Sequence, residues 1–107
     1  MKTPLSHKGD NMKALSSGSK AASAAIHNGA CWYLGMVLVA DAGTDCLATV
    51  WDSPDTTVTN DTVLDLVKGS DEDISPRSIL VHPVWCSKGI SVVLDAAEGD
   101  YVVWYAL

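Results

Sequence analysis

The longest apolar segment of this chain is ACWYLGMVLVA, Ala30 to Ala40, which contains no charged, amide or hydroxymethyl group. It is too short for a transmembrane helix, which needs about 20 apolar residues. It also fails as a signal peptide, because the preceding segment is long and broken and the run contains Gly35. As a strand it would extend roughly 36 Å at about 3.3 Å per residue. Gly35 would allow a bend or bulge, so that one segment could serve two sheets.

Both alternating faces of this predicted strand are apolar. One face carries Cys31, Tyr33, Val37 and Val39, and the other carries Trp32, Leu34, Met36 and Leu38. One face would cover the core, and the other needs a cover from an N-terminal arm, a neighbouring subunit or both. The predicted subunit or partner contact on the apolar face consists of Trp32, Leu34, Met36 and Trp104.

From residue 20 onward, short apolar segments alternate with turn residues, a pattern typical of an all-β domain. We predict a small antiparallel β-sandwich at 20–107, preceded by an extended N-terminal arm at 1–19. About seven strands are predicted, at 20–27, 30–40, 46–52, 62–67, 78–85, 89–95 and 101–106. The first two and the last two are expected to form hairpins. Residues 53–59 are predicted to be a polar connection, 68–76 an acidic loop, and the segment around Pro83 bent or at a sheet edge.

The charge is divided unevenly along the chain. Residues 1–20 carry four basic residues against one carboxylate, a net +3, and residues 21–107 carry three against twelve, a net −9. The total of −6 argues against a nucleic-acid partner. The arm is either a solvated tail or a segment that orders against an acidic neighbour, including another copy of the body. In the second case its lysines form a subunit or partner interface: Lys2, Lys8, Lys13 and Lys20.

No pattern of catalytic or metal-ligating residues is evident. The three cysteines are odd in number and widely spaced, which favours buried thiols in a reducing cytoplasm, although one disulfide with a leftover thiol stays open. His82 and Cys86 lack a second ligand pair for zinc. No histidine is placed as the base of a catalytic triad, and the glycines do not match phosphate-binding loops. We therefore predict a protein that is not an enzyme, with no cofactor and no metal.

All four tryptophans fall in predicted strands: Trp32, Trp51, Trp85 and Trp104. A carbohydrate-binding module would display several coplanar aromatic side chains on one exposed face. Core packing for some and subunit contact for the others is the favoured interpretation, because tryptophan is enriched at protein interfaces.

Three segments resemble a group of short tailed-phage and prophage proteins. They are residues 25–37 (AIHNGACWYLGMV), which contain an I-H-x-G-x-C motif, residues 49–52 (TVWD), which end a strand, and residues 86–92 (CSKGISV), which lead into the last predicted hairpin. The resemblance covers roughly residues 20–106 and implies a β-sandwich virion component. The closest role is a capsid decoration (cement) protein that binds the major capsid protein lattice and copies of itself.

The same resemblance implies a trimer on the capsid surface, made in the cytoplasm of the host bacterium. A tail or neck structural component and a host-glycan-binding attachment module are the alternatives. The copy number per virion would distinguish a capsid decoration protein from a tail or neck component. Binding to glycans would identify the attachment module.

Overall fold

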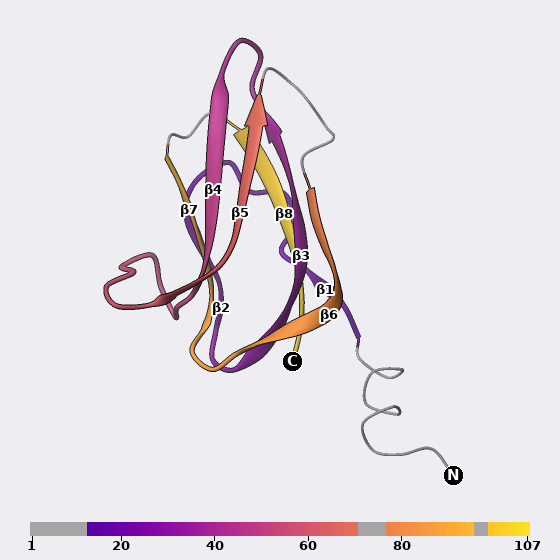
Figure 1. Cartoon of the computed structure of the whole chain (residues 1–107), viewed down its shortest axis with the longest axis vertical. Helices are drawn as coiled ribbons and strands as arrows, with labels where there is room; N and C mark the ends of the chain where they lie inside the picture. Colours follow the sequence, from indigo (N-terminus) through magenta and orange to yellow (C-terminus); the bar gives the residue numbers. More distant parts are fainter. Residues whose placement is uncertain (1–12, 71–76, 96–98) are drawn as a thin grey trace.

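The computed structural model describes residues 13–70, 77–95 and 99–107 of the chain. Within these ranges the chain forms strands and no helix (Figure 1), so the all-β prediction is confirmed. The eight strands are β1 (Leu15–Ser16), β2 (Ala24–Asn28), β3 (Cys31–Ala40), β4 (Asp45–Asp52), β5 (Thr62–Ser70), β6 (Arg77–Cys86), β7 (Gly89–Leu94) and β8 (Gly99–Ala106). One more strand than predicted is present, because Leu15–Ser16 forms β1 inside the predicted arm.

Two four-stranded antiparallel sheets make the sandwich, one in the order β1-β8-β3-β6 and the other in the order β2-β7-β4-β5. The pairing follows one rule, since β1 pairs with β8, β2 with β7, β3 with β6 and β4 with β5. The chain is therefore a single long hairpin with its tip at residues 53–61, rolled so that β3 also meets β8 and β4 also meets β7. This is the strand order of a jelly roll.

Neither predicted terminal hairpin forms. The Asn28-Gly29-Ala30 turn carries the chain from β2 in one sheet to β3 in the other, and β7 and β8 also lie in different sheets. The predicted first strand is divided as well, because Lys20 pairs with Tyr101 in one sheet and residues 24–28 pair with β7 in the other. Turn residues mark where a strand ends but do not specify whether the next strand joins the same sheet.

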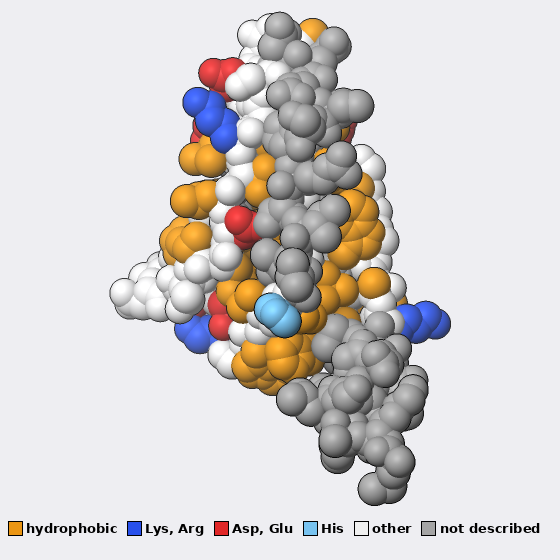
Figure 2. Space-filling view, turned by 45° about the vertical axis from the view of Figure 1, so that its right-hand side comes forward, with side chains coloured by type: hydrophobic (Ala, Val, Ile, Leu, Met, Phe, Trp, Pro, Cys, Tyr) orange, Lys and Arg blue, Asp and Glu red, His pale blue; other side chains and the backbone are white. Residues whose placement is uncertain are grey.

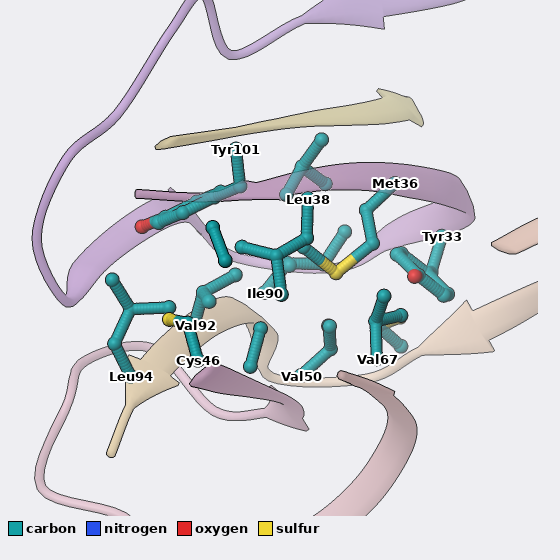
Figure 3. Packing of buried hydrophobic residues seen from close by; sticks show 14 of the residues in the cluster. Tyr33, Met36, Leu38, Cys46, Val50, Val67, Ile90, Val92, Leu94 and Tyr101 are labelled. Carbon is teal, nitrogen blue, oxygen red and sulfur yellow. The ribbon is translucent and has the colours of Figure 1, made fainter. Parts of the chain in front are cut away.

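The core lies between the inner faces of the two sheets (Figure 3). Tyr33, Met36 and Leu38 come from β3 and meet side chains of β4 and β7 such as Val50 and Ile90. The Tyr33 hydroxyl donates a 2.8 Å hydrogen bond to Asp65 Oδ2, which links β3 to β5 across the sandwich. Burial of these apolar side chains is the main source of stability, at about 25 cal/mol per Å² of apolar surface.

A bulge in β3 changes which residues face the core. The register with β8 shifts between Tyr33 and Gly35, so that Leu34 is the extra residue. Gly35 has φ = 143°, a backbone conformation that favours glycine. The buried residues are consequently Cys31 and Tyr33 before the bulge, and Met36, Leu38 and Ala40 after it. The predicted bulge is confirmed, but β3 belongs to one sheet rather than serving two.

Strand β6 is the edge of its sheet, as its proline suggested. Tyr33 pairs with Val84 and Gly35 with Ile79, so four residues of β6, including Pro83, lie opposite the single extra residue of β3. The missing amide hydrogen of proline is tolerated where ladder pairing is interrupted.

The end of the predicted arm is part of the sandwich. Ser17 N–H donates to Val103 O at 2.9 Å, and Lys20 and Tyr101 exchange two backbone hydrogen bonds of 2.8 Å. Residues 15–20 thus extend the β8 edge and do not cover a sheet face. The remainder of the predicted arm, residues 1–12, lies outside the described residues.

Candidate functional site

The outer face of the β1-β8-β3-β6 sheet is apolar along β3, and Asp100 of β8 adds an exposed carboxylate opposite Val39. Strand β3 contributes Trp32, Leu34 and Val37, which are partly buried, while their neighbours on the strand face the core. Val102 of β8 lies opposite Val37, and Trp104 lies opposite Gly35. We call this surface the tryptophan face, formed by Trp32, Leu34, Val37, Val39, Trp85, Val102 and Trp104.

Two tryptophans meet at the end of this face. Trp32 of β3 and Trp85 of β6 are direct partners in the ladder, and their rings contact edge to face with centroids 5.0 Å apart. Trp85 keeps 50% of its surface exposed. An interplanar angle of 62° does not form the flat platform on which a sugar ring stacks. A half-exposed indole held by a second indole is instead suited to inserting into an apolar recess of a protein partner.

The structure brings together only part of the predicted apolar contact. Trp32, Leu34 and Trp104 lie on the outer face, but Met36 is fully buried in the core. Its assignment to the outer face was wrong because alternation was continued through the bulge at Gly35. Trp85 was not included in the predicted contact, although its pairing with Trp32 places it on the same outer face.

Two of the predicted interface lysines can be placed. Lys13 is exposed at the start of the described chain, and Lys20 is partly buried where its backbone pairs with Tyr101. Lys2 and Lys8 lie outside the described residues.

Figure 2 shows hydrophobic side chains on several parts of the surface. The outer face of the second sheet contributes Leu66, which is 61% exposed, and Val63. Part of this face is covered by the loop at 53–61, since Ser91 is buried and donates a 3.0 Å hydrogen bond to Ser53 O. The second face is thus partly closed by its own chain.

Polar contacts of the site region hold turns in place. Asp52 accepts hydrogen bonds from the backbone amides of Ser87, Lys88 and Gly89, at 3.2, 2.9 and 3.3 Å. The Lys88 ammonium lies 2.7 Å from the Asp61 carboxylate and keeps the pKa of Asp61 below its usual value. These interactions fasten the 53–61 loop to the turn between β6 and β7.

Groups suited to catalysis are dispersed. Across residues 13–70, 77–95 and 99–107, no three or more His, Cys, Asp or Glu side chains are grouped so that they could hold a metal ion. His27 packs against the ring of Tyr105 at 5.6 Å, and His82 is exposed on β6. His7 lies outside the described part. No helix in the described part is long and apolar enough to span a membrane.

Comparison with known proteins assigns the chain to no family. No protein-family model matches the sequence, and neither a curated protein nor a solved structure is similar to it.

Proposed function

We propose that this chain is a non-enzymatic structural protein of a tailed-phage virion, a capsid decoration protein that binds the major capsid protein lattice through the tryptophan face. The observation that carries the proposal is the half-exposed Trp85 beside Trp32, on a sheet face whose β3 side chains are all apolar. Contiguous exposed apolar patches on small proteins mark interaction sites. Aromatic side chains at the centre of such patches commonly dominate binding.

Two further features support this role. The jelly-roll strand order occurs in viral capsid domains and also in lectins, so the fold permits the function without assigning it. The sequence also resembles short phage proteins at residues 25–37, 49–52 and 86–92. The edge-to-face geometry of Trp32 and Trp85 makes the glycan-binding alternative the weaker one.

Binding to capsids assembled from the major capsid protein of the same phage tests the proposal. Trp85→Ser should weaken binding at least tenfold, which corresponds to a loss of more than about 1.4 kcal/mol of binding free energy. Leu66→Ser is the matched control, because Leu66 is similarly exposed on the other sheet and should leave binding unchanged. The opposite pattern would place the interface on the second sheet, and failure of the unmodified chain to bind would refute a head location.

The copy number separates the head from the tail. Quantitative mass spectrometry of virions should find hundreds of copies for a decoration protein and roughly a dozen or fewer for a neck or tail ring. Light scattering of the purified chain tests the proposed trimer.

The basic arm gives a second contact in the same proposal. Deletion of residues 1–12 leaves the β1 pairing in place while removing two lysines and one aspartate. We expect the shortened chain to bind capsids more weakly. Its affinity should also fall less when salt is added, because salt screens attractions between exposed charges, with a screening length of about 10 Å at 0.1 M. Unchanged affinity would show that the arm does not contribute.

A further inference from the structure

Cys31 and Cys86 lie directly opposite each other on neighbouring strands. Cys31 begins β3, Cys86 ends β6, and the two are partners in the antiparallel ladder. Both side chains are fully buried, and the Cys86 thiol donates a 3.5 Å hydrogen bond to Val84 O. None of the three cysteines, all of them in the described part, forms a disulfide.

The backbone geometry of this pair suits a disulfide. Directly opposed residues of antiparallel strands have Cα atoms about 4.5–5.5 Å apart, within the range of about 4.4–6.8 Å that disulfides require. Their Cβ atoms are typically about 4.5–5.5 Å apart and need to approach to about 3.5–4.5 Å. Cys86 can make this small movement, because it ends an edge strand that pairs with a neighbour on one side only.

We propose that Cys31 and Cys86 form a redox site, in which a low-molecular-weight disulfide of the glutathione type converts the two thiols into a disulfide that fastens the end of β6 to β3. This inference is independent of the proposed virion function. It concerns a chemical modification of the chain that would act on the edge strand carrying Trp85.

The reaction is two successive thiol–disulfide exchanges. One cysteine thiolate attacks a sulfur of the small disulfide, forming a mixed disulfide and releasing one small thiol. The second cysteine thiolate attacks the protein sulfur of that mixed disulfide and releases the second small thiol. The two protons of the cysteines end on the released thiols, the chain loses two electrons, and the small disulfide gains them.

Burial makes this site slow to react in the folded chain. Desolvation raises the pKa of both thiols, that of Cys86 to about 12, and the Asp52 carboxylate raises both further. Because the thiolate is the attacking species, exchange requires the end of β6 to open. The same burial would shield the completed disulfide from reduction.

Cys46 provides an internal control. It lies on β4 in the opposite sheet and packs near Gly99, so it is not a ladder partner of either Cys31 or Cys86. We expect Cys46 to keep its thiol under conditions that link the other two.

The full chain tests the proposal directly. It is unfolded in urea, refolded in a mixture of reduced and oxidised glutathione, and alkylated, and its peptides are mapped by mass spectrometry. Cleavage before Asp41 and Asp45 separates Cys31 from Cys46. We expect peptides of Cys31 and Cys86 linked to each other and Cys46 carrying the alkyl group. Alkylation of all three cysteines, or a linkage that includes Cys46, would overturn the proposal.

Stability provides the second measurement. In Cys46→Ala the disulfide should still form, and the oxidised chain should melt about 5 °C or more above the reduced chain, because the bond constrains the unfolded state. Cys86→Ala should lose both the linkage and the redox-dependent difference. An equal or lower melting temperature of the linked chain would show that the bond does not fasten β6. Mapping of the unsubstituted chain remains decisive if a variant fails to fold.

Discussion

Substitution of Leu34 and Met36 by alanine tests the bulge in β3. The two residues are separated by one position, and simple alternation would place them on the same face. In the structure Met36 is fully buried, whereas Leu34 is a partly buried residue of the tryptophan face. The two substitutions remove side chains of similar size, so any difference in the free energy of unfolding reports their surroundings.

The expected magnitudes differ clearly. Met36→Ala removes a fully buried side chain and leaves a cavity, which costs about 2–5 kcal/mol. Leu34→Ala loses only part of the roughly 1.5–3 kcal/mol that complete burial of a leucine provides, or about 1 kcal/mol. A third variant, Gly35→Ala, removes no atoms but must adopt φ = 143°, which costs about 1–3 kcal/mol.

Urea unfolding at one protein concentration, followed by tryptophan fluorescence, measures these changes. With a slope of about 1–3 kcal/mol per M, a difference of about 2 kcal/mol separates the midpoints of the Leu34 and Met36 variants by roughly 1 M. Costs equal to within 0.5 kcal/mol, or a larger cost for Leu34→Ala, would refute the change of face at the bulge.

Three further changes follow from individual contacts. A double-mutant cycle of Tyr33→Phe and Asp65→Ala should give a coupling of about 1–2 kcal/mol in urea unfolding, since the 2.8 Å bond joins a buried hydroxyl to a carboxylate, and additive effects would contradict it. Burial raises the pKa of Tyr101 to about 12. The contribution of its neutral phenol to stability is therefore complete below the ordinary tyrosine pKa near 10 and is lost as the pH rises through 12. Ultraviolet titration should find a phenol that ionises near pH 12, and this phenol should be missing in Tyr101→Phe. Gly89→Ala should lower the free energy of unfolding by at least about 2 kcal/mol, because the added Cβ would collide with the His27 carbonyl oxygen. Gly43→Ala should lower it by about 1 kcal/mol in the same assay, because a Cβ at Gly43 would meet open space.

The strand positions were predictable because they depend on local signals. The apolar run at 30–40 became β3 at 31–40, and the segments at 46–52 and 101–106 became β4 and β8 with small extensions. Pro83 correctly indicated an edge strand. In each case a turn residue or an alternating pattern close to the strand carried the information.

The partners of the strands were not predictable in this way. β7 and β8 are close in sequence and turn residues separate them, yet Ile90 and Tyr101 reach the core from opposite sheets. Every pair in this fold except β4 with β5 joins segments that are distant in sequence, so no local signal identifies them. The pairing of Cys31 with Cys86 was not predicted for the same reason, because the two residues are far apart in sequence.

Three of the four residues of the predicted apolar contact lie on one face of the sheet, and the bulge is the reason that the fourth, Met36, does not. Both faces of β3 are apolar, and the core buries only the side chains of the inner face. Before Gly35 the outer residues are Trp32 and Leu34, and after it they are Val37 and Val39, so the apolar outer surface continues along the whole strand. Because the described strands form only two layers, this surface has no third layer of strands upon it. The apolar residues on both sides of this central strand are the reason that we place the proposed partner on the tryptophan face.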